Sequence, residues 1–406
     1  MIYLKLAWKN IWRNKRRTGI TWASIFFAVI LSSLMMSVKE GVYDNMISTT
    51  VGDYSGYAQI HARDYWQEKT IEYSFEPTEE LINAIQSEEL VNEYLPRIES
   101  FALAASDEIT KGAMVVGIDA EKEALINGFA DRVYEGEYLT VNSKGILVGA
   151  GLAEYLKVGV NDTIVLLGSG YHGVTAAGKY HIQGLVKFGS PELSKQLVFM
   201  SLSQAQTLYG AGTMLNTIVL DVEDGDAGAE AVKALRTVLP EDYEVMDWVE
   251  LNPDLVNMIE TDKVEGYVFM FIMYLVISFG IFGTMLMMLA EQRHEFGVLV
   301  AIGMKRIKLA VLVFLEVVFI SVIGAFLGII GAYPISLYFN INPIDLGGGE
   351  MGEMYEDYGL EAVLQFSVDP MVFLTQAIVI AIMASVIALY PFGSILRLNA
   401  IEEMRS

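Results

Sequence analysis

The 406-residue sequence contains no cysteine and only 19% charged residues, and both shortages exclude classes of protein. Without cysteine there is no disulfide framework, no thiolate zinc site and no thiol catalysis. A hydrophobic content of 53% indicates apolar segments beyond what one soluble core needs. The net charge of −23 nevertheless requires a large acidic part in water. We therefore predict an integral membrane protein with a large polar domain.

The chain also lacks the signatures of common catalytic sites. It has no G-x-x-x-x-G-K-[ST] P-loop and no G-x-S-x-G nucleophile motif. His294-Glu295 begins like the zinc motif H-E-x-x-H, but Val298 occupies the position of the second histidine. The glycine-rich segments 149–151 and 168–170 complete no nucleotide fingerprint, and we interpret them as turns. We expect no catalytic residue, no cofactor, no metal site and no nucleic-acid partner, so this chain is not predicted to be an enzyme.

Four apolar runs reach the length of about 20 residues that spans a hydrocarbon core of about 30 Å. They are Gly19–Val38, Tyr267–Ala290, Leu309–Leu337 and Met371–Tyr390. Residues 39–265, between the first and second runs, contain no comparable segment. The predicted fold is an α-helical membrane protein with one transmembrane helix, a large domain and three further transmembrane helices.

Charge placement predicts the orientation of these helices. Six Lys and Arg and no acid precede the first run, and four lie in residues 291–308; residues 338–370 have seven acids and no Lys or Arg. Residues 39–265 carry 38 acidic against 15 basic residues. By the positive-inside rule, residues 1–18, 291–308 and 391–406 are cytoplasmic. The segments 39–265 and 338–370 are then extracytoplasmic.

The N-terminal region allows more than one interpretation. The first apolar run is too long for a cleaved signal peptide, and Ser-Val-Lys-Glu follows it in place of a cleavage site, which favours retention as an anchor. Residues 1–18 interleave apolar and basic side chains at near-helical spacing. An amphipathic helix on the inner membrane face and a cytoplasmic extension of the first helix explain this pattern equally well.

Residues 39–265 mix strand and helix signals. Strand-like runs occur at Gly145–Val148, Thr163–Leu167, His181–Val186, Leu197–Met200 and Thr217–Val222. Helical patterns occur at Glu79–Gln86, Ser203–Leu208 and Ala227–Leu239. Ser203 with Gln206 is typical of a capping box. The mixture predicts an α+β domain that is large enough for two subdomains.

The third apolar run contains two unusual features. Glu316 lies about seven residues into it, where an ionised carboxylate costs on the order of 2.5–3.5 kcal/mol. A packing or gating contact explains this residue, and so does a hydrated position near the cytoplasmic interface. Gly324, Gly328 and Gly331 form a small-residue track that allows another helix to approach closely. That helix belongs either to this chain or to a second subunit, and Pro334 is expected to end the contact.

The segment Glu291–Met304 places charged residues first and then apolar residues at helical spacing. It predicts a short amphipathic helix in the cytosol that a soluble partner could bind; an interfacial helix resting on lipid is the alternative. The residues assigned to it are Glu291, Arg293, Glu295, Phe296, Gly297, Val298, Leu299, Ile302 and Gly303.

This segment resembles the E-x-R-x-E-[IF]-G-x-L-x-A-[IL]-G signature of FtsX-like ABC transporter permeases. In that family it forms the coupling helix that docks on a separate ATPase. The opening Leu6–Thr18, Glu316, the glycine track and the core segment 145–165 are similar to further family features. So is the ending from Tyr390-Pro391 to Arg405, although Ala400 and Glu403 depart from its usual pattern. The size of the domain and the missing P-loop most resemble the lipoprotein-releasing branch.

The resemblance implies a permease subunit of the bacterial inner membrane with both termini in the cytoplasm. Its implied partners are a cytosolic ABC ATPase dimer, a second permease copy or paralogue, the lipid bilayer, and a lipoprotein or periplasmic protein. The leading hypothesis is extraction or export of a lipoprotein or other amphipathic substrate. The alternatives are a mechanotransmitter that activates an external cell-wall hydrolase, and a membrane-anchored sensor without an ATPase.

Overall fold

The computed structural model describes residues 2–13, 15–107, 109–347, 349, 352, 355 and 362–397, without the side chains of residues 2–4, 16 and 17. The chain divides into two compact units. The helical unit comprises Met1–Asp44, Met258–Asp345 and Val363–Ser406, and the α/β unit comprises Asn45–Asn257 and Leu346–Ala362. We describe each unit by itself.

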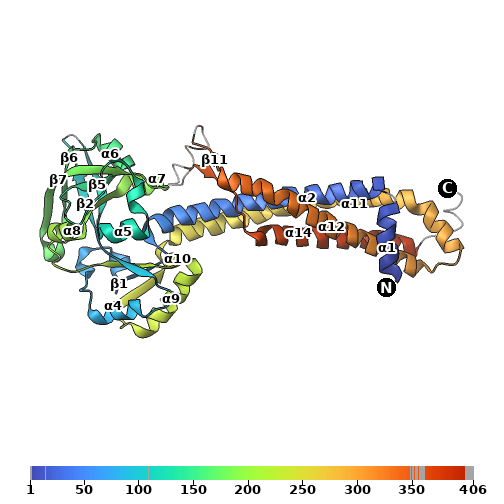
Figure 1. Ribbon diagram of the computed structural model, residues 1–406, viewed down its shortest axis with the longest axis horizontal. Helices are drawn as coiled ribbons and strands as arrows, with labels where there is room; N and C mark the ends of the chain where they lie inside the picture. Colours follow the sequence, from blue (N-terminus) through green and yellow to red (C-terminus); the bar gives the residue numbers. More distant parts are fainter. Residues whose placement is uncertain are drawn as a thin grey trace. The chain divides into compact units, whose positions relative to one another are not determined.

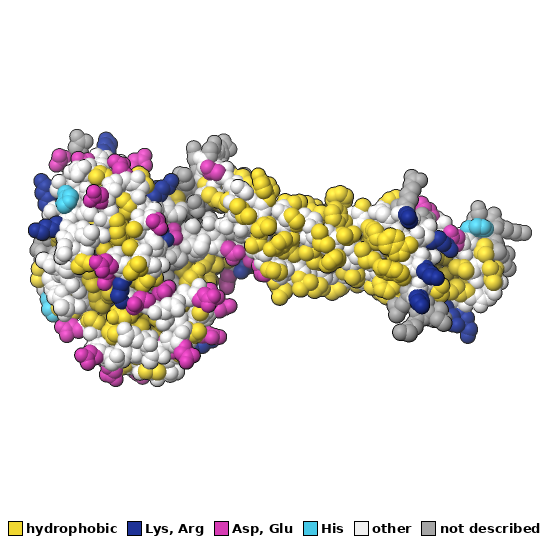
Figure 2. All heavy atoms as spheres, in the orientation of Figure 1, with side chains coloured by type: hydrophobic (Ala, Val, Ile, Leu, Met, Phe, Trp, Pro, Cys, Tyr) yellow, Lys and Arg dark blue, Asp and Glu magenta, His cyan; other side chains and the backbone are white. Residues whose placement is uncertain are grey.

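The helical unit contains four helices that are long and apolar enough to cross a membrane. One precedes the α/β unit along the chain and three follow it. They lie in α2 (Lys15–Ile47), α11 (Pro253–Ala301), α12 (Arg306–Ile341) and α14 (Pro370–Ile387), and the unit also holds α1 (Ile2–Arg13), α15 (Leu389–Leu396) and the strand pair β11 (Ile344–Asp345) and β12 (Val363–Leu364). Figure 2 shows that hydrophobic side chains cover most of the bundle, while Lys and Arg gather at the end that carries α1.

Helices α2, α11 and α12 are longer than the apolar runs that predicted them, whereas α14 ends at Ile387, before the end of its run. Helix α11 begins at Pro253 and continues without a break through the segment predicted to be a separate short helix. Only at Gly303 does the backbone adopt φ +108°, a conformation that favours glycine and ends the helix. Helix α12 likewise continues past Pro334 to Ile341.

The α/β unit is built on a mixed, mainly antiparallel sheet of ten strands (Figure 1). The strand order is β10-β1-β9-β2-β3-β8-β5-β7-β4, and β6 pairs with β2 and β7. The strands are β1 (Ala58–Ala62), β2 (Glu93–Ala105), β3 (Thr110–Ile118), β4 (Val133–Gly136), β5 (Ile146–Gly149), β6 (Thr163–Ser169), β7 (Thr175–Val186), β8 (Leu197–Ser201), β9 (Thr217–Asp221) and β10 (Tyr243–Asp247). Parallel pairing occurs between β3 and β8 and between β5 and β7.

Helices connect the strands and cover the sheet. They are η1 (Ser48–Ser55), α3 (Tyr65–Glu68), η2 (Ile71–Tyr73), α4 (Glu79–Gln86), α5 (Ala120–Ile126), η3 (Phe129–Arg132), α6 (Ala150–Leu156), η4 (Tyr171–Gly173), α7 (Pro191–Gln196), α8 (Leu202–Tyr209), α9 (Gly225–Val238) and α10 (Trp248–Leu251). Side-chain caps start several of them: Thr78 caps α4, Asp224 caps α9, and Asp247 forms a capping box with Glu250 at α10. Separate apolar cores form where α4 and α9 cover β1 and β9, and where α6 and α8 cover β5 and β8.

The five predicted strands and three predicted helices of this unit are all present, but three local predictions are wrong. Residues 168–170 form no turn, because Gly168 and Ser169 belong to β6 and pair with Ala176 and Thr175 of β7. Helix α8 begins at Leu202 after Ser201, so Ser203 lies inside its first turn and forms no capping box. Residues 149–151 form no turn, because β5 ends at Gly149 and α6 starts at Ala150. A Cβ atom on Gly149 would lie 2.3 Å from the carbonyl oxygen of Ser194, so this glycine allows α7 to approach closely.

Two stretches cannot be compared with the predictions. Most of the predicted acidic loop, from residue 348 to residue 361, and the family-like ending at residues 398–406 lie largely outside the described residues.

Candidate functional site

The predicted coupling segment forms the last turns of α11, and its side chains divide between two environments. Phe296 and Gly297 are buried in the bundle, with Phe296 packed in its apolar core. Val298, Leu299 and Ile302 are 37%, 38% and 80% exposed. An anchored helix end with an exposed apolar surface is suited to docking a soluble protein.

Charged residues surround this exposed surface. Glu291, Arg293 and Glu295 are exposed on α11, and Lys305, Arg306 and Lys308 are exposed where α12 begins. The turn between the two helices is closed by backbone hydrogen bonds, from Gly303 N to Val300 O at 3.0 Å and from Met304 N to Leu299 O at 3.1 Å. The turn therefore presents apolar and cationic groups on a defined backbone.

Helix α1 contacts both the coupling segment and the buried carboxylate of α12. It lies across the bundle as a separate helix, with Ile11 buried (Figure 1). Arg13 forms an ion pair with Glu295, and Asn10 Nδ2 donates to Glu316 Oε2 at 2.9 Å. The rings of Trp8 and Phe319 meet edge to face, 6.1 Å apart. The N-terminal segment is thus no continuation of α2.

Glu316 has no solvent-exposed surface in the helical unit. This burial favours a packing contact over a hydrated position near the interface, and the assignment of Glu316 to packing or gating stays a prediction. The sequence signal was the acidic residue within an apolar run, but its partner on α1 lies 306 positions away in the sequence. Only the tertiary structure brings the two together.

The glycine track on α12 packs against α2 of the same chain. A Cβ atom on Gly324 would lie 3.0 Å from Ile25 Cβ, and one on Gly328 would lie 2.6 Å from Val29 Cβ. At Gly331 the nearest atom, at 2.8 Å, also belongs to α2. The close contact does not end at Pro334, because Ser37 Oγ donates to Ser336 Oγ at 3.0 Å beyond it.

At the opposite end of the bundle, polar contacts that sequence reasoning missed join α2 to α11. Asp262 accepts a hydrogen bond from Tyr43 Oη at 2.5 Å and forms an ion pair with Lys39 Nζ at 3.0 Å. A cavity of about 360 Å³ lies nearby, and carboxylates from Glu40, Asp44 and Asp369 line it. The sequence signal was only the charge at the ends of the apolar runs.

The described residues contain no group of three or more His, Asp or Glu that could hold a metal ion. His61, on β1, is fully buried, and burial lowers its pKa to about 4. Its Nδ1 lies 3.0 Å from the carbonyl oxygen of Asn216, and its ring stacks on Tyr65. Such a histidine is neutral and packs as a core residue.

Two family models match separate parts of this chain. A model of the FtsX-like permease C-terminal region matches residues 267–400, and a model of the MacB-like periplasmic core domain matches residues 18–238, more than half of the chain. The matches to solved structures have low similarity. The extracellular domain of the transporter YknZ is 16% identical with a TM-score of 0.32, covering 47% of this chain and all of that one. The periplasmic region of MacB from Actinobacillus actinomycetemcomitans is 11% identical with a TM-score of 0.35, covering 52% and 94%.

Curated relatives are similarly distant. The lipoprotein-releasing system transmembrane protein LolC of Neisseria meningitidis serogroup B is 24% identical over 221 residues, or 52% of each chain. The macrolide export ATP-binding/permease protein MacB of Rhodopseudomonas palustris is 26% identical over 251 residues, or 56% of this chain and 38% of that protein. The aligned part thus spans about half or less of these relatives. On the strength of the two family models, the chain belongs to the FtsX-like permeases of ABC transporters and carries a MacB-like periplasmic core domain.

Proposed function

We propose that this permease couples ATP hydrolysis by a separate cytosolic ABC ATPase to movement of its extracytoplasmic domain. The observation that carries the proposal is the coupling segment at the end of α11. It combines the family signature with exposed apolar side chains at Val298, Leu299 and Ile302 and with exposed cations at the start of α12. The 406-residue sequence contains no P-loop motif, which supports placing the nucleotide site on a separate partner chain.

The proposed orientation follows from charge. Residues 1–18, 291–308 and 391–406 face the cytoplasm of a bacterial cell, and residues 39–265 and 338–370 lie outside the inner membrane. The proposed transmembrane parts are residues 19–38, 267–290, 309–337 and 371–390. The first three lie within the longer helices α2, α11 and α12, and the fourth runs through α14 into α15.

Helix α11 is the proposed lever. It contains 49 residues, which at about 1.5 Å per residue corresponds to roughly 74 Å of continuous helix. A force applied at Leu299 therefore acts on the same rigid element that begins at Pro253. The two polar contacts of Asp262 link α11 to α2, so a movement of α11 is passed on to α2.

A second permease copy or a paralogue completes the proposed transporter. Only 17% of the most apolar stretch of α11 is buried within the chain, compared with 56% for α12. The helix is thus the most accessible of the four to a second subunit or to lipid. The proposed cargo is a lipoprotein or another amphipathic molecule, supported by the relative named as part of a lipoprotein-releasing system.

The test is co-purification of the partner with surface variants. Leu299→Glu and Ile302→Glu place a charge on the docking surface, whereas Val174→Glu alters an exposed apolar residue of the α/β unit and serves as the matched control. The permease is isolated from native membranes in mild detergent, and retained proteins are identified by mass spectrometry. We expect a P-loop ATPase with the native and Val174→Glu chains and its loss with the other two.

The other outcomes distinguish the alternatives. ATP-dependent release of a lipoprotein from reconstituted vesicles supports the proposed cargo. A stably bound cell-wall hydrolase without cargo release means mechanotransmission. If no ATPase is retained even with a non-hydrolysable nucleotide, the coupling proposal is overturned and the sensor hypothesis replaces it.

A further inference from the structure

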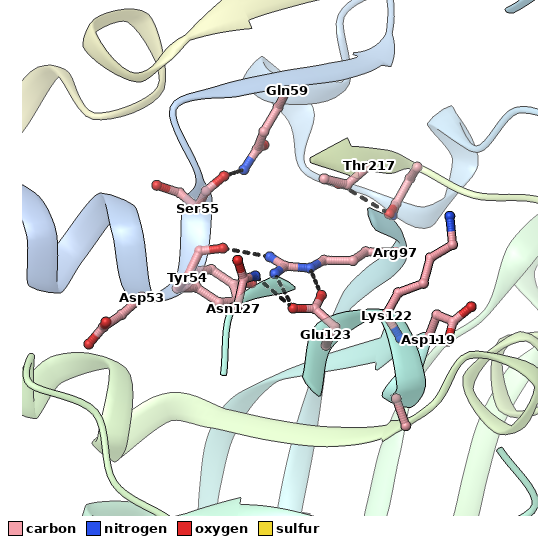
Figure 3. A network of polar contacts seen from close by, with 12 residues as sticks. Asp53, Tyr54, Ser55, Gln59, Arg97, Asp119, Lys122, Glu123, Asn127 and Thr217 are labelled. Atoms are coloured by element: carbon pink, nitrogen blue, oxygen red, sulfur yellow. Dashed lines mark hydrogen bonds and ion pairs between the residues drawn. The ribbon is translucent and has the colours of Figure 1, made fainter. Parts of the chain in front are cut away.

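Helix η1 continues directly from α2 and is the first element of the α/β unit. It is a π-helix, a rare form often associated with functional sites. Its end is held by two arginines that come from later elements: Arg97 on β2 and Arg132 at the end of η3. Figure 3 shows Arg97 extending between the end of the η1 helix and Glu123.

Arg97 binds the backbone of η1 and a buried carboxylate at the same time. Its Nη1 donates to the carbonyl oxygen of Tyr54 at 2.6 Å, while Nε and Nη2 donate to Glu123 at 2.6 and 3.1 Å. The Arg97 and Glu123 side chains are only 2% and 1% exposed. Asn127 Nδ2 donates to Glu123 at 2.9 Å and fixes the carboxylate further (Figure 3). A carbonyl left unpaired at a helix end is thereby satisfied by a fixed cation.

Arg132 binds Asp53, the residue before Tyr54 in η1. Its Nη2 donates to Asp53 Oδ1 at 2.8 Å, and its Nη1 donates to the Asp53 carbonyl oxygen at 3.3 Å. The guanidinium carbon lies 5.9 Å from the ring centres of both Phe129 and Phe188. The backbone amide of Gly189 donates to the other Asp53 oxygen at 3.4 Å.

Apolar contacts also hold η1 against Gly189 and Phe199. A Cβ atom on Gly189 would lie 2.7 Å from Thr49 Cγ2, so a larger side chain there would push η1 away. Tyr54 packs edge to face on Phe199, with ring centres 6.4 Å apart. Immediately after η1, Gly56 has φ +71°, and the chain turns there into β1. Without the arginines, this turn is the natural place for the helix to bend.

We propose that Arg97 and Arg132 are positioning residues that fix η1 to the aromatic core formed by Phe129, Phe188 and Phe199. Motion of α2 is then delivered to this core as a rigid unit and is not lost by bending at Gly56. Burial alone does not require such an arrangement, because a buried ion pair often contributes little net stability. This inference rests on the proposed function, in which the membrane helices move the α/β unit.

The experiment first weakens the attachment of η1 to this aromatic core, which we call the joint, and then restores it with a disulfide. Asp53→Asn with Arg132→Gln removes the half-buried grip and leaves Arg97 and Glu123 paired, so the fold is retained. Since the chain has no cysteine, Thr49→Cys with Gly189→Cys creates a single disulfide across the joint; their Cβ atoms would lie about 3.1 Å apart, close to disulfide geometry after a small shift. Thr49→Cys alone, which leaves Gly189 in place, is the control.

The first readout is hydrogen exchange of the whole permease, which needs neither ATPase nor cargo. We expect exchange of amides 48–56 to rise roughly tenfold in the Asp53→Asn/Arg132→Gln chain, as loss of charge-assisted hydrogen bonds implies, with an unchanged sheet. Oxidising the cysteine pair in that background should restore protection, and reducing it should reverse the effect. Unchanged exchange in the loosened chain would show that the contact between Arg132 and Asp53 does not fix η1, and the proposal that both arginines position this helix would be overturned.

The second readout is coupling in the complex with its ATPase. The complex that contains the loosened chain should hydrolyse ATP normally but lose most ATP-dependent cargo release, and the oxidised pair should restore release. In the native background the oxidised pair should have no effect. If it instead abolishes release, the joint must open during the cycle and the proposal is overturned. Absence of any ATPase would contradict the proposed function while leaving the exchange result intact.

Discussion

The two units hold their helices by opposite means. Between α2 and α12 the contact is made by glycines, with backbones so close that an added Cβ would collide with Val29. Around η1 the contact is made by buried charge, with Arg97 and Glu123 almost completely inaccessible. In a bilayer, apolar side chains gain nothing by leaving lipid, so close packing of small residues has to supply the association. In a domain surrounded by water, a fully paired charge can be buried around an otherwise apolar core.

The largest effect is expected when one partner of the buried ion pair between Arg97 and Glu123 is removed. Arg97→Met leaves the Glu123 carboxylate without its cation, and we expect the free energy of unfolding of the α/β unit to fall by about 3–5 kcal/mol. Chemical unfolding of the purified chain in detergent measures it. The Arg97→Met/Glu123→Met chain is the control and should recover much of the loss. A cost below about 1 kcal/mol for the single variant would contradict this account.

A pH titration should also separate the two units. Burial lowers the pKa of His61 to about 4, below the value of about 6.5 for an unfolded chain. The unfolded state therefore binds the proton first, and the stability present above pH 6.5 is lost as the pH falls towards 4, by about 3 kcal/mol in total.

His61→Phe keeps the stacking on Tyr65 and should flatten this part of the pH profile. Burial raises the pKa of Glu99, so its contribution runs in the opposite direction and is lost as the pH rises. Because Glu99 is present in both chains, the difference between their unfolding midpoints from pH 7 to pH 4 isolates His61. Parallel profiles would show that His61 does not titrate as inferred.

In the helical unit, a single methyl group should be enough to disturb the packing. Gly328→Ala places a Cβ atom 2.6 Å from Val29 Cβ, and we expect a loss of about 1–3 kcal/mol from overpacking. Gly280→Ala on α11 is the matched control, because nothing lies within 4 Å of its added Cβ. That control should be neutral or stabilising by up to about 1 kcal/mol. Thermal unfolding of both variants and the native chain in one detergent measures the effect. Equal unfolding midpoints for Gly328→Ala and Gly280→Ala would contradict the close packing of α12 on α2.

The smallest effect is expected at the ion pair between α1 and the coupling segment. The side chains of Arg13 and Glu295 are 63% and 51% exposed, so water and salt screen their attraction. A double-mutant cycle with Arg13→Gln and Glu295→Gln should give a coupling energy below about 1 kcal/mol that vanishes at high salt. A larger, salt-insensitive value would mean that this pair is not the exposed contact seen here.

Sequence patterns predicted the elements well where each signal is local. The strands at 145–148 and 217–222 and the helix at 79–86 follow from side-chain periodicity, which a short window contains. The cap of α8 was misplaced by two residues because Ser201 and Ser203 carry the same local signal. The continuous end of α11 was missed because a change from apolar to charged residues does not break a helix, and Gly303 was needed to end it.

The candidate residues show the same limit. Glu316 and the glycine track stand out in an apolar sequence, but their partners Asn10 and Val29 lie about 300 positions away. Arg97 and Arg132 gave no signal at all, since a lone arginine in a strand or turn is ordinarily a surface residue. Their role depends on which elements surround them.

The sequence by itself determined the apolar helices, the acidic α+β domain, the coupling signature and the family, because each is a property of composition or of short-range order. Only the tertiary structure decided that α2 covers the glycine track, that α1 satisfies Glu316, and that two arginines secure η1. The physical reason is that a buried polar group or a close helix contact is stable only when its partner is present. Folding brings these partners together from distant positions in the sequence.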